Sequence, residues 1–108
     1  MNSSIVIALP KIDDAKKIRT ILNRHGFSVA AVCSTASTAL ASMSELDGGI
    51  LICGYKLTDR YYRDVLEDIP SYFEMLLLAS GRVIAEAPTS VLTVEMPMKV
   101  SDLVNTVD

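Results

Sequence analysis

The side chains of this sequence that could do chemistry are few and lie apart. The only histidine is His25, and the acidic pair Asp13 and Asp14 follows the first apolar run. A lone histidine makes a poor metal site, and carboxylates at the start of a helix complement the helix dipole. No nucleophile is paired with a base, and no cluster of metal ligands can be recognised from the spacing. The sequence therefore predicts no catalytic residue, no metal, no cofactor and no enzymatic activity.

A second group of side chains interleaves basic residues with aromatic rings. Its members are Tyr55, Lys56, Arg60, Tyr61, Tyr62 and Arg63. Such a cluster can stack nucleobases and hold phosphates, but nearby acids cancel its charge. These acids are Asp59, Asp64, Glu67 and Asp68. Because the whole chain also has a formal net charge of −3, we interpret the cluster as a solvated helix face with one tyrosine packed inward, and we expect no DNA binding.

The composition is that of one globular domain over residues 1–108. Half of the residues are hydrophobic and 21% are charged, which argues against disorder. No basic start precedes an apolar segment, and no apolar run is long enough to span a bilayer. We expect a cytoplasmic protein without membrane contact. Cys33 and Cys53 end apolar runs and are interpreted as reduced core thiols, with a single disulfide as the alternative.

An alternation of strands and helices must position these side chains. Continuous apolar runs, typical of strands covered on both faces, span residues 5–9, 29–32, 50–52, 75–78 and 91–94. Helical spacing fills the intervals. We expect a helix over residues 12–24 that ends at His25-Gly26, a second after an N-cap at Ser34 or Ser37, and a short third that begins at Thr58. Residues 81–90 leave room for one or two turns or a loop, and residues 100–107 have the spacing of a last helix.

This order of elements predicts an α/β fold with a doubly wound, five-stranded parallel sheet. Right-handed crossovers are required between such strands. Five strands in about a hundred residues fit the flavodoxin-like order 2-1-3-4-5, with the fourth helix short or missing. In that order a functional crevice lies beyond the carboxyl ends of the first and third strands.

The residues at the carboxyl ends of the strands resemble those of a known family in position but not in type. They are Leu9 and Pro10, then Gly54, then Ala79 and Ser80, and finally Met96 and Pro97. With His25-Gly26-Phe27 ahead of the second strand, this arrangement resembles the receiver (CheY-like) domain of bacterial two-component response regulators. The resemblance covers the whole chain in length and element order.

The resemblance implies a phosphorylation pocket whose chemical groups are lost. A working receiver has an acceptor aspartate after the third strand, an acid pair for Mg²⁺ after the first, a hydroxyl after the fourth and a lysine before the last proline. In this sequence the corresponding positions hold Gly54, Leu9 with Pro10, Ala79 and Met96; only Pro97 is kept. Asp13 and Asp14 come about a turn too late to replace the acid pair. The resemblance thus implies a pseudo-receiver, a degenerate domain that takes no phosphoryl group.

Several segments are similar to a narrower family, the ANTAR-type transcription antitermination regulators. These segments are IVIALPKIDDAKKIRTILNRHGF, ILICGYKLTDRYY, FEMLLLAS and MPMKVSDLVNTV. In that family a receiver-like half precedes a coiled coil and a helical module that binds RNA hairpins. The last helix carries no stop signal, so we expect the domain to be truncated before such a module. RNA binding would then belong to that module alone.

Two functions follow as hypotheses. The first is a regulatory module that forms a homodimer through its last helix, because receivers commonly pair through the face that includes this helix. The residues assigned to this dimer face are Met98, Val100, Leu103, Val104 and Val107. The alternative is a sensor of a small ligand or a partner protein. It would use the vacated crevice, whose apolar mouth is predicted at Leu9, Pro10, Gly54, Tyr55 and Met96.

Overall fold

The computed structural model describes residues 4–96 and 99–107. It contains a parallel sheet of five strands in the order β2-β1-β3-β4-β5, which confirms the predicted topology. The strands are β1 (Ser4–Ala8), β2 (Val29–Cys33), β3 (Gly49–Gly54), β4 (Phe73–Ala79) and β5 (Leu92–Glu95). The helices are α1 (Ile12–Arg24), α2 (Ala36–Ser44), α3 (Tyr62–Asp68), α4 (Gly81–Ala85) and α5 (Val100–Val107). Pro97 and Met98, two of the predicted site residues, lie outside the described residues.

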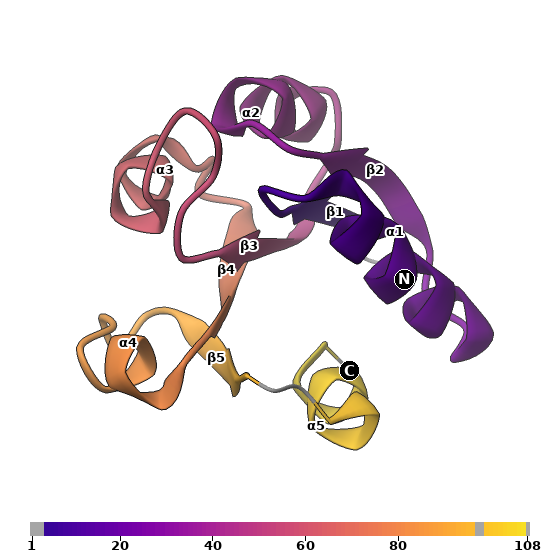
Figure 1. Ribbon diagram of the computed structural model, residues 1–108. Helices are drawn as coiled ribbons and strands as arrows, with labels where there is room; N and C mark the ends of the chain where they lie inside the picture. The colour runs from indigo at the N-terminus through magenta and orange to yellow at the C-terminus, as the bar shows by residue number, and fades with distance from the viewer. Residues whose placement is uncertain (1–3, 97–98, 108) are drawn as a thin grey trace.

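Helices cover both faces of the sheet, with α2, α3 and α4 on one side and α1 and α5 on the other (Figure 1). Successive side chains of a strand point to opposite faces. Val6 and Ala8 of β1 accordingly join the core under α2, α3 and α4, whereas Ile5 and Ile7 join the core under α1 and α5. This two-sided burial is the reason that the strands read as continuous apolar runs.

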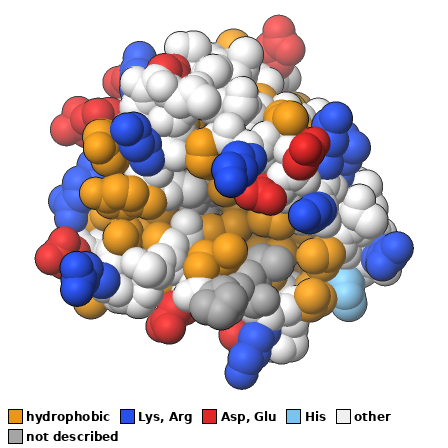
Figure 2. All heavy atoms as spheres, in the orientation of Figure 1, with side chains coloured by type: hydrophobic (Ala, Val, Ile, Leu, Met, Phe, Trp, Pro, Cys, Tyr) orange, Lys and Arg blue, Asp and Glu red, His pale blue; other side chains and the backbone are white. Residues whose placement is uncertain are grey.

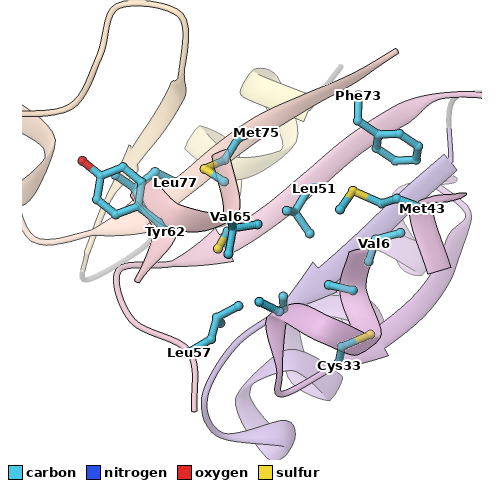
Figure 3. Packing of buried hydrophobic residues seen from close by; sticks show 14 of the residues in the cluster. Val6, Cys33, Met43, Leu51, Leu57, Tyr62, Val65, Phe73, Met75 and Leu77 are labelled. Atoms are coloured by element: carbon cyan, nitrogen blue, oxygen red, sulfur yellow. The ribbon is translucent and has the colours of Figure 1, made fainter. Parts of the chain in front are cut away.

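The larger core gathers buried side chains from four strands, β1 to β4, and from the helices α2 and α3. Figure 3 shows Leu51, Met75 and Leu77 of the sheet facing Met43 of α2 and Tyr62 of α3. Tyr62 is only 1% exposed, as expected for the one tyrosine of the basic and aromatic cluster that packs inward. A large aromatic ring buries much apolar area, so Tyr62 fixes the start of α3 against the sheet.

The end of α1 has the geometry that its sequence predicts. Gly26 adopts a φ of 85°, a left-handed conformation that costs glycine little. The N–H of Phe27 donates to the carbonyl of Leu22 at 3.0 Å, and the N–H of Gly26 donates to that of Asn23 at 3.2 Å. This pair of bonds is a Schellman motif, which satisfies the last helical carbonyls.

Two helix starts differ from the prediction. The N-cap of α2 is Thr35, whose side chain accepts from the N–H of Thr38 at 3.2 Å, and not Ser34 or Ser37. The third helix begins at Tyr62 rather than after Thr58. Thr58 lies four residues before this start, and its hydroxyl donates instead to the carbonyl of Ser34 at 3.1 Å. The hydroxyl thus ties the loop after β3 to the start of α2.

Both cysteines are free and buried, which confirms that they are core thiols and not a disulfide. Burial raises the pKa of the Cys53 thiol to about 12, so this group stays protonated and unreactive at neutral pH. Within residues 4–96 and 99–107, no helix has the length and apolar character needed to cross a membrane.

Candidate functional site

The candidate site lies where β1 and β3 end side by side. Ala8 pairs with Cys53 in the last register position of these two strands. Leu9 and Pro10 follow β1 directly, and Gly54 is the last residue of β3. These residues line a single cavity of about 500 Å³. The structure therefore brings together residues that are more than forty positions apart in the sequence.

All five residues predicted for the mouth of the crevice line this cavity. They are Leu9, Pro10, Gly54, Tyr55 and Met96. The remaining predicted residue of the pocket that the structure describes, Ala79, lies on the other face of β4, in the larger core. It is joined to the site through the backbone, because its carbonyl accepts from the N–H of Met96 at 2.8 Å.

Gly54 is buried and closely surrounded by carbon atoms. A Cβ added at this position would lie 3.2 Å from Cδ2 of Leu9 and 3.5 Å from Cδ of Pro10. The described non-glycine residues have no positive φ, and Gly54 itself is not among the glycines that do. Its backbone conformation is therefore open to other residues, and the restriction at this position comes from the apolar side chains that fill the space beside it.

Helix α1 supplies a wall of the cavity that the sequence prediction did not include. Ile18 and Ile21 contribute carbon, whereas Asp14 and Lys17 contribute charge. The prediction assigned Asp14 only to the helix start, and the structure places it at the cavity as well. The apolar stripe of α1 was the signal that could have identified Ile18 and Ile21. Lys56 and Leu78 complete the lining. Figure 2 shows a face on which apolar side chains gather around a hollow and charged side chains surround them.

A second cavity, of about 360 Å³, lies between α3 and α4. It is lined by Tyr55, Tyr61, Tyr62, Arg63, Arg82, Val83 and Glu86. Two arginines of the basic and aromatic cluster are already engaged. Arg63 lies over the ring of Tyr62 and donates to the carbonyl of Glu86 at 2.7 Å, and Arg60 forms an ion pair with Asp68 at 2.7 Å. This engagement agrees with the interpretation of the cluster as a helix face and not as a nucleic-acid site.

Asp59 has a structural role that its sequence position does not reveal. Its carboxylate accepts from the N–H of Ala36 at 2.7 Å and from the N–H of Ser37 at 3.2 Å. It thus caps the first turn of α2 together with Thr35. The bond from Ala36 holds the pKa of Asp59 below its ordinary value of 3.8, because hydrogen bonds to the charged form stabilise that form.

The predicted dimer face is only partly on the surface. Val100 is 41% exposed and Val104 is half-buried. Leu103 and Val107, however, are buried in the core between α5 and the sheet, so they hold the helix in place and are not available to a partner. Met98 lies outside the described residues.

No cation site is evident within the described ranges. Among residues 4–96 and 99–107, no three histidine, cysteine, aspartate or glutamate side chains come together to hold a metal ion. Asp14 is the one carboxylate among the described residues that line the larger cavity.

Comparison with solved structures identifies the fold. A sensor protein from Polaromonas sp. JS666 superposes with a TM-score of 0.83 at 19% identity, covering 99% of this chain and 94% of that one. A receiver domain (CheY-like) from Methylobacillus flagellatus gives a TM-score of 0.80 at 12% identity, with both chains fully covered. The chain has the receiver fold. No family model and no curated protein matches the sequence.

The receiver fold also occurs in this comparison as part of longer proteins. The response regulator PhyR from Brucella abortus aligns over 99% of this chain with a TM-score of 0.80 at 17% identity. The chain spans about half the length of that protein, 48% of it. At these identities the likeness extends to the fold alone, and the site must be judged from the residues that occupy it.

Proposed function

We propose that this domain is a receiver-type regulatory module that is not switched by aspartyl phosphorylation. The observation that carries the proposal is the buried Gly54 at the end of β3, enclosed by Leu9 and Pro10. Phosphoryl transfer to a carboxylate needs an acceptor oxygen, a Mg²⁺ ion held by acids and a cation that reads the new charge. Methyl and methylene groups supply none of these, and the receiver fold of the solved structures supports the regulatory role.

The test is direct chemical phosphorylation. The protein is incubated with acetyl phosphate and Mg²⁺, and with beryllofluoride and Mg²⁺, beside a receiver that carries the acceptor aspartate. We expect the intact mass and the amide NMR spectrum of this protein to stay unchanged while the control receiver responds to both reagents. A stoichiometric phosphoryl adduct would contradict the proposal.

A narrower form of the proposal assigns the domain to an ANTAR-type antitermination regulator, as a dimerisation module. The support is the likeness of the segments ILICGYKLTDRYY and MPMKVSDLVNTV to the receiver-like half of that family. RNA would then be bound by a separate C-terminal helical module. The coding sequence downstream of residue 108 decides this point, since a coiled coil and an ANTAR module are expected there. A different effector module, or a stop codon, would remove this form of the proposal and leave the broader one standing.

The cavity of about 500 Å³ favours a second candidate function, the sensing of a small ligand. Its volume lies within the range of ligand sites, about 300–1,000 Å³. A screen of metabolites by thermal shift tests this candidate. A saturable rise in melting temperature would support it, and the absence of any shift would favour the module that acts through protein contacts alone.

A further inference from the structure

The larger cavity, here called the crevice cavity, has an apolar body and a charged rim. Leu9, Ile18 and Leu78 form part of its wall, and each is less than a tenth exposed. Lys17, Lys56 and Asp14 also line it, and all three are exposed. A hydrocarbon surface in a concave site gains free energy when a ligand replaces its water. The charged residues decide what kind of ligand the surface accepts.

The rim carries a local charge opposite to that of the whole chain. Two lysines against one aspartate leave one positive charge at the cavity, in a protein whose formal net charge is −3. Among the described residues the one ion pair within 4.0 Å joins Arg60 to Asp68, so neither rim lysine is neutralised by a direct bridge there. Nζ of Lys56 lies 5.3 Å from the centre of the ring of Tyr61, a cation–π contact with a residue that lines the cavity between α3 and α4.

We infer that the crevice cavity binds an amphipathic monoanion, namely a compact aliphatic or aryl group that bears one carboxylate. This inference rests on the second candidate function and specifies its ligand. The hydrocarbon part would lie on Leu9, Ile18 and Leu78, and the carboxylate would face Lys17 and Lys56. An inorganic phosphate would leave the apolar wall unused, whereas a neutral hydrocarbon would leave the rim lysines without a partner.

Tyr55 can report ligand binding in the crevice cavity, and its side chain connects this cavity to α3. Its side chain lines both the crevice cavity and the cavity between α3 and α4. The centre of its ring lies 5.3 Å from that of Tyr61 and 6.0 Å from that of Tyr62. The sequence contains no tryptophan, and three of its four tyrosines are Tyr55, Tyr61 and Tyr62, so tyrosine fluorescence comes largely from this region. The amide signals of Gly54 and Tyr55 report on the cavity itself.

The test is a titration of the chain with hexanoate, octanoate and the uncharged analogue octanol, followed by NMR and tyrosine fluorescence. We expect saturable shifts at Ile18, Gly54 and Tyr55. Octanoate should bind about tenfold more tightly than hexanoate, because two more methylenes are buried. It should also bind several-fold more tightly than octanol at low salt, an advantage that falls as salt screens the lysines.

Charge variants separate the rim from the rest of the surface. The double variant Lys17→Gln/Lys56→Gln should lose the preference for octanoate over octanol while still binding both. Lys16→Gln, an exposed lysine on the same helix that does not line the cavity, should keep it. The variant Ile21→Phe, which adds volume at the cavity wall, should weaken both ligands. Circular dichroism checks that each variant is folded.

Three results would overturn the inference: no saturable shift with octanoate, equal affinity for octanoate and octanol, or an unchanged preference in the double lysine variant. These outcomes are independent of the phosphorylation test. A chain that binds no carboxylate can still be resistant to acetyl phosphate, and a chain that takes a phosphoryl group would refute the regulatory proposal whatever the titration shows.

Discussion

At the scale of single residues, the lack of a side chain at Gly54 determines what the end of β3 can do chemically. Its backbone does not demand glycine, but the space beside it is occupied by Cδ2 of Leu9 and Cδ of Pro10. An aspartate placed here would put a carboxylate beside these carbon atoms, whereas the charged side chains that line the same cavity, Asp14, Lys17 and Lys56, are exposed at its rim. We therefore expect a single aspartate introduced here to add a buried charge and not a phosphorylation site.

We predict that Gly54→Asp lowers the free energy of unfolding by about 2–4 kcal/mol at pH 7, the cost of a buried and unpaired polar group. Burial would raise the pKa of the new carboxyl in the folded state, so the loss should shrink as the pH falls and the group is protonated in both states. Urea unfolding at pH 7 and pH 5 measures this. Gly54→Ala, the matched control, should lose about 1 kcal/mol or less and show no such pH dependence. An aspartate variant as stable as the alanine variant, or one phosphorylated by acetyl phosphate, would contradict the prediction.

Asp59 provides the second test at a single side chain. Its pKa is lowered in the folded state, first by the bond from the N–H of Ala36. The stability it contributes is therefore present at neutral pH and is lost as the pH falls below the ordinary value of 3.8. Asp59→Ala should lower the melting temperature by a few degrees at pH 7, because the N–H groups of Ala36 and Ser37 lose their acceptor. The difference from the native protein should shrink as the pH falls through the lowered pKa of Asp59.

The control for Asp59 is Asp47→Asn, an exposed acid in the turn before β3 for which no side-chain hydrogen bond is observed among the described residues. It should change the melting temperature little at either pH. If Asp59→Ala melts at the native temperature at pH 7, the cap has no energetic role and the hydrogen bonds are incidental.

Asp59 also shows where prediction from the sequence ends. The sequence placed it among acids that balance a basic helix face, and for Asp68 that role is confirmed by its pair with Arg60. Asp59 instead reaches a helix 22 or 23 positions earlier in the chain. Capping by a residue distant in sequence depends on tertiary packing, and no local pattern reveals it. The N-cap of α2 could not be predicted for a related reason. Serine and threonine are nearly equal as N-cap residues, so residue type alone does not select Thr35 over Ser34 or Ser37.

Among the elements, α5 has two roles, packing against the sheet and exposing apolar side chains, whereas the prediction from the sequence assigned its whole apolar stripe to a dimer face. The spacing of Val100, Leu103, Val104 and Val107 predicts an apolar stripe correctly, and the helix spans these residues. A stripe does not say what covers it. The structure packs Leu103 and Val107 onto the sheet and leaves Val100 and Val104 toward the outside, so the stripe is divided between the core and the surface.

We predict that Leu103→Ala lowers the free energy of unfolding by about 2–4 kcal/mol, because it leaves a cavity between α5 and the sheet. Val104→Ala on the outer side should cost less than about 1 kcal/mol. Chemical unfolding of both variants at low protein concentration measures the difference. Equal losses would mean that the two residues share one environment, which would contradict the packing of α5.

At the level of the whole molecule, the sheet order followed from the alternation of elements because parallel strands need crossovers of fixed hand. The same order brought the ends of β1 and β3 together, so five of the residues that line the crevice cavity, Leu9, Pro10, Gly54, Tyr55 and Met96, could be predicted from the strand ends. The volume of the cavity and the contribution of Lys17 and Ile21 could not, since they depend on how closely α1 packs against the sheet. The start of α3 was also missed, because the loop over residues 55–61 forms its own hydrogen bonds, such as that from the N–H of Tyr62 to the carbonyl of Tyr55 at 2.9 Å.

Self-association is the remaining property of the whole molecule, and it depends on the outer side of α5. We predict a concentration-dependent dimer in sedimentation experiments, with Val100 and Val104 in the contact. In a two-fold symmetric interface the same surface patch of each copy faces the other, so Val100 and Val104 of one copy would lie close to those of the second. The double variant Val100→Lys/Val104→Lys would therefore bring like charges together and should weaken the dimer by at least about tenfold. Asn105→Lys, at an exposed residue of the same helix, adds the same charge as one of these lysines and should leave the association unchanged, because the predicted contact is formed by Val100 and Val104. Because Leu103 and Val107 remain in the core, the double variant should keep the native melting temperature in dilute solution. A native chain that stays monomeric at millimolar concentration, or a double variant that associates as tightly as the native chain, would show that α5 serves the sheet alone.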